Sequence, residues 1–252
     1  MSSSPITACT THAEAAAASP ALLAIDTSTE RLAVAVQAAG REAGVSEPGG
    51  ALASARLLPV VQMLLAKLGT RLSALDAIAF GQGPGAFTGL RTACAVVQGL
   101  ALGAGKPVLP VDSLALVAED ARAQLGDAAG TVSVAMDARM DEIYAATYRW
   151  TGSRWQVLAA PALWAADALA ARWQAEPPAC VAGSALAAFG ERLPTGAARR
   201  VMHEHDRAAA LRRLAEQAWH AGLAIDPALA LPLYVRDKVA LTTAERAAKV
   251  LP

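Results

Sequence analysis

The sequence has 252 residues, and 22 Lys+Arg balance 22 Asp+Glu, so the formal net charge is zero. A neutral chain lacks the basic surface by which a protein holds nucleic acid alone, so any such contact is expected to involve a partner. The hydrophobic share is 54%, but only 4% is aromatic, which indicates helices packed through small side chains. Cys9, Cys94 and Cys180 form no CxxC pair, so we expect no zinc site or disulfide framework, and a reducing cytoplasm fits best.

The first part of the chain, residues 1 to 21, is rich in Ala, Ser and Thr. It has no basic segment followed by a strongly apolar run, so neither a signal peptide nor a membrane span is expected. Its composition predicts a disordered extension that ends where the first strand begins.

From Leu22 the pattern predicts a β-hairpin whose first strand ends at Asp26 and whose second strand alternates apolar and polar residues. A helix over residues 51–69 and a buried strand over 75–80 follow. The next ten residues read GQGPGAFTGL, and the chain then continues as a helix, a strand and a second helix up to residue 125.

Around residue 131 the plan begins again, with an apolar strand ending at Asp137, a polar turn and a returning strand through residue 147. A half-chain repeat of this kind predicts two lobes of one design. We divide the chain into an extension (1–21), lobe I (22–117, rejoined by a helix at 206–222), lobe II (118–205) and a C-terminal tail (223–252).

The alternation of strands and helices predicts an α/β protein. A hairpin that opens each half, with carboxylates facing each other across a cleft, is the plan of the two-lobed actin-like ATPases built from duplicated ribonuclease H-like units. This analogy concerns the fold and does not assign an activity.

The stretch GQGPGAFTGL admits several interpretations. It fits the dinucleotide-binding pattern G-x-G-x-x-G/A, but Pro84 removes an amide donor and Asp112 lies beyond the usual spacing of ~20 residues to the ribose-binding acid. It is no Walker A loop, because no Gly-Lys-Ser/Thr follows. The remaining interpretation is a sharp turn into a closely packed helix, on which Gly99 and Gly103 share one face that another backbone can approach.

A set of turn residues could hold a nucleotide. In an actin-like ATPase, carboxylates at these turns hold hydrated Mg²⁺ while hydroxyls and turn amides meet the phosphates of ATP or ADP. The competing interpretation is that Asp and Thr are simply favourable turn residues and that no cofactor binds. The candidates are Asp26, Thr27, Ser28, Asp137 and Gly183.

No residue is expected to be catalytic or to ligate a metal. His203 and His205 are two apart and would point to different faces of a helix, unlike the HExxH pair of a metallopeptidase. No serine stands in a G-x-S-x-G motif.

Four blocks of the sequence resemble, in order, those of the TsaB (YeaZ) family, the dimerisation subunits of the bacterial machinery for tRNA threonylcarbamoyladenosine. They are AIDTSTERLAVAV, AFGQGPGAFTGLRTACAVVQGLALG, AMDARMDEIYAATY and PLYVRDKVAL. The resemblance implies the actin-like fold and no turnover of its own. It implies pairing with the transferase TsaD or with a second copy. It also implies that the P-loop protein TsaE joins and that tRNA is contacted only through the complex.

In TsaD two histidines on the first helix help to hold a metal, whereas the helix at 51–69 here contains none, so the resemblance implies a scaffold rather than a catalyst. It also implies pairing through the two helices that flank the glycine loop. An apolar stripe there predicts that Leu64→Glu or Val97→Glu breaks pairing and leaves the monomer folded. The expected interface residues are Leu57, Leu58, Val61, Leu64, Leu65, Phe87, Arg91, Ala93, Val97 and Leu100. The alternative function is an actin-like ATPase or phosphotransferase that acts alone.

Overall fold

The computed structural model describes residues 19–50, 53–126 and 130–236. Most of the expected extension therefore lies outside the described residues, as does the tail beyond Arg236. The folded chain begins slightly before Leu22, because Pro20 is buried and the Ala21 amide donates to a carboxylate oxygen of Asp76 at 2.7 Å.

The chain forms two five-stranded sheets. Sheet A contains β1 (Leu22–Asp26), β2 (Arg31–Ala38), β3 (Arg41–Pro48), β4 (Ala77–Gly83) and β5 (Val108–Asp112). Sheet B contains β6 (Thr131–Asp137), β7 (Glu142–Trp150), β8 (Trp155–Ala165), β9 (Cys180–Ala182) and β10 (Arg199–Val201). The helices are α1 (Ala53–Lys67), α2 (Phe87–Ala104), α3 (Ser113–Leu125), α4 (Ala166–Ala175), α5 (Ala185–Phe189) and α6 (Arg207–His220), with 3-10 turns η2 (Leu72–Ala74), η4 (Gly190–Arg192) and η5 (Pro227–Leu229).

The two sheets have the same topology. Sheet A is ordered β3-β2-β1-β4-β5 and sheet B, read from its other edge, β8-β7-β6-β9-β10. In each, three antiparallel strands precede two strands that run parallel to the first. Asp26 and Asp137 end the equivalent strands β1 and β6. The predicted duplication, and with it the two-lobed actin-like fold, is confirmed.

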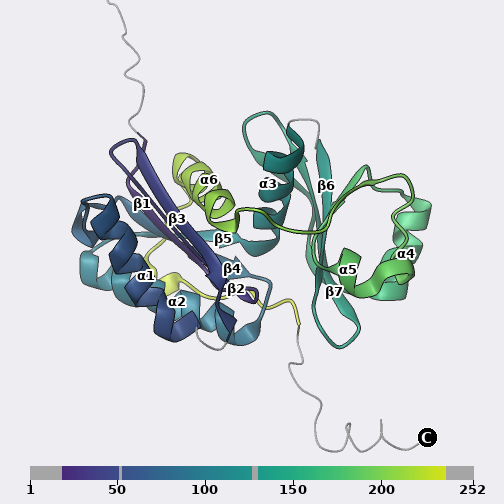
Figure 1. The fold of residues 1–252 in the computed structure, drawn as a ribbon, viewed down its shortest axis with the longest axis horizontal. Helices are drawn as coiled ribbons and strands as arrows, with labels where there is room; N and C mark the ends of the chain where they lie inside the picture. Colours follow the sequence, from purple (N-terminus) through teal and green to yellow (C-terminus); the bar gives the residue numbers. More distant parts are fainter. Residues whose placement is uncertain (1–18, 51–52, 127–129, 237–252) are drawn as a thin grey trace, which may run out of the picture.

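Figure 1 shows five layers in sequence across the molecule: α1 and α2, sheet A, α3 and α6, sheet B, then α4 and α5. Each sheet thus has helices on both faces. The expected lobe boundary at residues 117 and 118 lies within α3, which packs against both sheets. Helix α6 returns from lobe II and packs against β1 and β2 of sheet A.

A buried carboxylate joins the two lobes in the middle layer. Glu119 on α3 accepts hydrogen bonds from Arg122, from Arg213 on α6 and from the indole of Trp155 on β8. Burial raises the pKa of Glu119, but these three donors lower it by more, so the pKa lies below the usual value. The carboxylate is therefore charged at neutral pH and fixes α3, α6 and sheet B relative to one another.

The inner faces of α1 and α2 form the core of lobe I. Leu57, Val61, Leu64, Leu65, Ala93 and Val97 are all buried against sheet A. The expectation that these residues leave an apolar stripe free for a partner is wrong, because helical periodicity identifies an apolar face but not what that face covers. Within the set expected to pair, Leu58 and Arg91 are exposed, and Phe87 and Leu100 are partly exposed.

The outward faces of α1 and α2 carry residues other than those of the expected apolar stripe, apart from Leu58. On α1 they carry Leu58 and Met63, which are 44% and 50% exposed. On α2 they carry Ala95, Gly99 and Gly103, which are exposed and successively four residues apart. Added Cβ atoms at the two glycines would meet nothing within 4 Å, so another chain could approach this face closely.

Helix α2 is also, among the helices of the described residues, the one that is long and apolar enough to cross a membrane by length and composition. Its apolar side chains have another explanation in this fold, because Leu90, Ala93, Val97 and Ala101 are buried.

Because Leu64 and Val97 are buried, we expect their substitution by Glu to destabilise the fold, and not only to break pairing. Leu64→Glu or Val97→Glu places a charge in the core of lobe I and is expected to lower the free energy of unfolding by at least about 3 kcal/mol. Leu58→Glu is the matched control on the same helix and should change it by no more than about 0.5 kcal/mol. Urea denaturation in dilute solution measures all three, and a folded, stable Leu64→Glu chain would contradict this packing.

Candidate functional site

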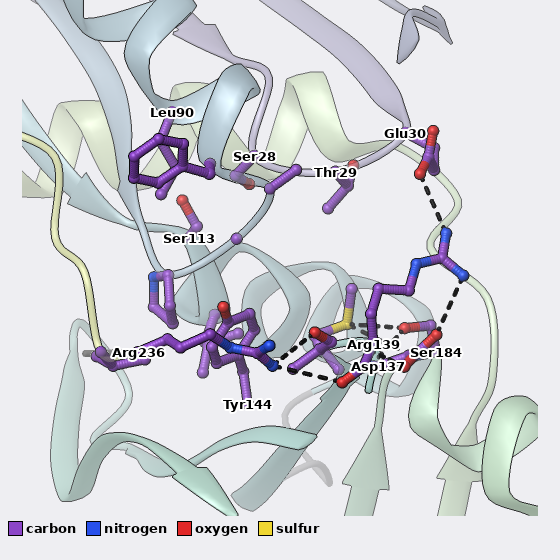
Figure 2. A pocket seen from close by; sticks show the side chains of 18 of the residues that line it. Ser28, Thr29, Glu30, Leu90, Ser113, Asp137, Arg139, Tyr144, Ser184 and Arg236 are labelled. Carbon is purple, nitrogen blue, oxygen red and sulfur yellow. Dashed lines mark hydrogen bonds and ion pairs between the residues drawn. The ribbon is translucent and has the colours of Figure 1, made fainter. Parts of the chain in front are cut away.

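A cavity of about 720 Å³ lies between the lobes. Its walls come from the β1–β2 turn, the glycine loop and the start of α3 in lobe I, from the β6–β7 turn and α5 in lobe II, and from the tail. Figure 2 shows Ser28, Thr29 and Leu90 facing Asp137, Tyr144 and Ser184 across this space. The residues for which the sequence left a nucleotide site open lie at this cleft or behind its walls.

The carboxylate at the end of β1 is engaged within the protein. Asp26 is fully buried, and its Oδ1 accepts from Arg207 Nε at 2.8 Å and from Ser28 Oγ at 3.0 Å. Its Oδ2 accepts from Ser113 Oγ at 3.2 Å. Both oxygens that would face a hydrated metal ion are therefore occupied by donors of the chain itself.

The guanidinium that neutralises Asp26 is itself buried at the start of α6. Burial would lower the pKa of Arg207, but the charges of Asp26 and Glu204 raise it above the usual arginine value, so Arg207 remains charged. Asp120 sets its position, since this buried carboxylate accepts from the amides of His205 and Asp206. A permanent cation thus stands against the carboxylate where an ATPase would hold hydrated Mg²⁺.

The glycine loop packs against the β1–β2 turn. A Cβ on Gly81 would lie 1.7 Å from Asp26 Oδ2, and one on Gly89 would lie 1.8 Å from the Thr27 carbonyl oxygen. Thr27 Oγ1 in turn donates to the carbonyl of Gly89 at 2.7 Å. These glycines leave room for the chain's own turn, which agrees with the close-packing interpretation and not with a phosphate cradle.

The other two glycines of the loop have similar neighbours. A Cβ on Gly85 would lie 2.3 Å from the Ser28 carbonyl oxygen. One on Gly83, whose φ is +122°, would lie 2.6 Å from the carbonyl oxygen of Leu233 in the tail. Through these contacts the loop joins the β1–β2 turn, α2 and the tail. The peptide between Gly83 and Pro84 is cis.

The second turn, between β6 and β7, makes ion pairs in the cavity wall. Arg139 pairs with Glu30 of lobe I at 3.1 Å and with Asp137 at 3.4 Å, as the dashed lines in Figure 2 show. The Arg139 amide donates to Asp137 Oδ1 at 2.8 Å, so this amide is directed at the chain and not at the cavity. Gly183 is required by packing, because a Cβ there would lie 2.2 Å from the Ala135 carbonyl oxygen.

Of the five nucleotide-binding candidates, only Ser28 and Asp137 line the cavity; Asp26, Thr27 and Gly183 are packed behind its surface. The arginines of the cavity wall are also engaged. Their acceptors are Ser46 for Arg31, Glu30 for Arg139, Asp26 for Arg207 and Glu142 for Arg236. The buried groups Asp26 and Arg207 and the largely buried Arg236 are thus unavailable to a hydrated Mg²⁺ with a polyphosphate, which needs uncommitted carboxylate oxygens and cations.

Sequence reasoning missed the two arginines that organise this cleft. Arg207 is 181 residues from Asp26, and Arg236 lies 98 residues from the Ala138 carbonyl that it contacts. The block PLYVR, which ends at Arg236, was the available signal for the second. Within the described residues, no three His, Cys, Asp or Glu side chains converge as a metal site would require.

The buried pair predicts a strong response to loss of one partner. Arg207→Met leaves the Asp26 carboxylate buried without its cation and should lower the free energy of unfolding by about 3–5 kcal/mol. The double variant Asp26→Asn, Arg207→Met should regain part of this loss, because position 26 then carries no charge that needs a buried cation. Urea denaturation at neutral pH measures both.

Arg139→Met is the matched control at the same cleft. Arg139 and Glu30 are both largely exposed, so this variant should change the free energy of unfolding by no more than about 1 kcal/mol. Equal losses for Arg207→Met and Arg139→Met would contradict the role assigned to the buried pair.

Comparison with known proteins places the chain in a family. The family model described as TsaD, tRNA N6-adenosine threonylcarbamoyltransferase, matches residues 51 to 241. The tRNA threonylcarbamoyladenosine biosynthesis protein TsaB of Haemophilus influenzae is 43% identical over 123 residues, covering 49% of this chain and 51% of that protein. The TsaB protein of Escherichia coli is 39% identical over 146 residues, covering 56% of this chain and 62% of its own length.

The solved structure of YeaZ from Pseudomonas aeruginosa extends the similarity. It superposes with a TM-score of 0.77 at 39% sequence identity, covering 85% of this chain and 99% of the YeaZ chain. The alignments with the two TsaB proteins span about half to three fifths of those proteins, whereas the structural match spans nearly the whole of YeaZ. The chain therefore belongs to the TsaB (YeaZ) family, and it also matches the TsaD family model.

Proposed function

We propose that this chain is a non-catalytic scaffold and dimerisation subunit that binds TsaD, with TsaE, in the cytoplasm. In that assembly it supports threonylcarbamoyl transfer to N6 of the adenosine 3′ of the anticodon in tRNAs that read codons beginning with A. Family membership and the names of the TsaB relatives support the pathway. tRNA is contacted through the complex, which agrees with a chain of zero net charge.

The observation that carries the non-catalytic part is the buried contact of Asp26 with Arg207. An actin-like ATPase needs the carboxylate of β1 to hold hydrated Mg²⁺, and here a charged guanidinium already satisfies that carboxylate. Hydrolysis of ATP by the chain acting alone, the alternative function, would require this pair to be broken and a buried charge to be left unpaired.

The pairing part rests on the outward surface of α1 and α2, which we call the pairing face. It consists of Leu58 and Met63 on α1 and of Ala95, Gly99 and Gly103 on α2, with Phe87 and Arg91 where α2 begins. Small residues four apart allow a partner helix to come close, and the flanking Leu and Met side chains supply apolar area. A second copy or TsaD would occupy the same face, so the two modes of pairing exclude each other.

Enlarging one residue of the pairing face should therefore block both partners. A side chain at Gly99 has open space in the monomer, so Gly99→Phe should fold normally and weaken pairing by at least about tenfold, or about 1.4 kcal/mol. Sedimentation equilibrium with the chain alone and with TsaD measures the pairing. The matched control is Ala171→Phe, an exposed alanine on α4 of lobe II, which should pair normally.

The activity test is reconstitution of TsaD and TsaE with tRNA and threonylcarbamoyl-adenylate, read by mass spectrometry of the modified adenosine. Formation of the product should require this chain and be reduced by Gly99→Phe but not by Ala171→Phe. Equal product without the chain would refute the proposed function.

A further inference from the structure

The tail crosses from lobe I to lobe II beside the cavity. We call residues Leu231–Arg236 the strap. In Figure 1 this segment lies at the yellow end of the colour scale and runs from lobe I toward lobe II. Four of its residues, Leu233, Tyr234, Val235 and Arg236, line the interlobe cavity.

Two hydrogen bonds with Gln82 fix the strap to lobe I. The amide of Leu233 donates to the carbonyl of Gln82 at 2.7 Å, and Gln82 Nε2 donates to the carbonyl of Leu231 at 3.0 Å. The close approach depends on Gly83, where any side chain would collide with the Leu233 carbonyl. The strap is thus attached to the glycine loop immediately before α2.

A surface cluster joins the strap to the pairing face. The ring of Tyr234 packs on that of Phe87 with centroids 5.0 Å apart, and Arg91 Nε donates to the Tyr234 hydroxyl at 3.1 Å. The Arg91 guanidinium lies 3.8 Å from the centroid of the Phe87 ring. Tyr234 remains 43% exposed, and Arg91 is exposed, so a molecule on the pairing face would reach both side chains.

At its other end the strap holds the β6–β7 turn of lobe II. Arg236 is only 12% exposed; it pairs with Glu142 at 2.7 Å and donates to the Ala138 carbonyl at 2.9 Å. The turn itself is strained, because Arg139 and the two residues that follow it have φ values of 63°, 57° and 64° without being glycine. Such a conformation persists only where surrounding contacts hold it, and Arg236 supplies such contacts.

The same turn has a second arginine clamp that belongs to lobe II. Arg192 makes two hydrogen bonds with Asp141, at 2.6 and 2.7 Å, and lowers the pKa of that carboxyl. Both arginines contact the β6–β7 turn. Arg192 belongs to lobe II, whereas Arg236 belongs to the strap, which is fixed to lobe I. Of these two arginines, Arg236 alone belongs to a segment that contacts α2.

We propose that the strap couples the pairing face to the β6–β7 turn, so that occupation of the pairing face stabilises the turn through Tyr234 and Arg236. This inference rests on the proposed pairing. A partner that restricts Arg91 and Tyr234 fixes the strap, and a fixed strap holds the Arg236 guanidinium against Glu142 and the Ala138 carbonyl. The stability of the β6–β7 turn in the cleft then depends on whether a partner is bound, even when the cleft holds no ligand.

Hydrogen exchange of the full chain tests the coupling. A peptide covering residues 136–145 is followed by mass spectrometry at low and high concentration of the chain, and with saturating TsaD. Pairing should slow exchange in this peptide by about fivefold or more in the wild type. In Arg236→Met, pairing should be retained and this slowing lost.

Arg192→Met is the matched control, since it removes a guanidinium from the same turn but leaves the strap intact. It should speed exchange of the unpaired chain and keep the further slowing on pairing. Pairing without any change in this peptide, or slowing that persists in Arg236→Met, would overturn the coupling alone. No pairing of the wild type with itself or with TsaD would remove the proposed function as well.

Discussion

The buried ion pair between Asp26 and Arg207 determines how the rest of this molecule is arranged. It connects the end of β1 with the start of α6, and the hydroxyls of Ser28 and Ser113 complete its hydrogen bonds. Gly81 is required beside it, because a side chain there would displace the carboxylate. The end of β1 thus fixes α6 between the two sheets. The interlobe cleft therefore contains a structural joint.

In the proposed function the surface of α1 and α2, and not the cleft, meets the partner. Helices α1 and α2 use their apolar faces for the core of lobe I, and their outward faces combine leucine and methionine with a row of small residues. The strap contacts the N-terminal end of α2 and runs beside the cavity to the strained β6–β7 turn. As proposed above, a partner bound to α2 stabilises the β6–β7 turn of lobe II through contacts made by the strap. Such coupling suits a subunit that assists the chemistry of another protein.

Much of this fold could be predicted from the sequence, because the hairpins with a terminal acid at Asp26 and Asp137 repeat and the main helices are strongly periodic. Strands β3, β8 and β10 were missed, since β3 is a polar edge strand, β8 carries apolar residues without regular alternation and β10 has only three residues. The orientation of Leu64 and Val97 could not be predicted, because periodicity does not say whether a face meets a sheet or a partner. The partner of Asp26 is distant in sequence, and no local motif marks Arg207.

The most direct measurement of the central claim is calorimetric titration of the purified full chain with Mg-ATP. The account predicts no saturable heat at millimolar nucleotide, because the Asp26 carboxylate is satisfied by Arg207 and the arginines of the cleft are paired within the chain. Saturable binding that requires Mg²⁺, accompanied by release of phosphate from the chain alone, would contradict it.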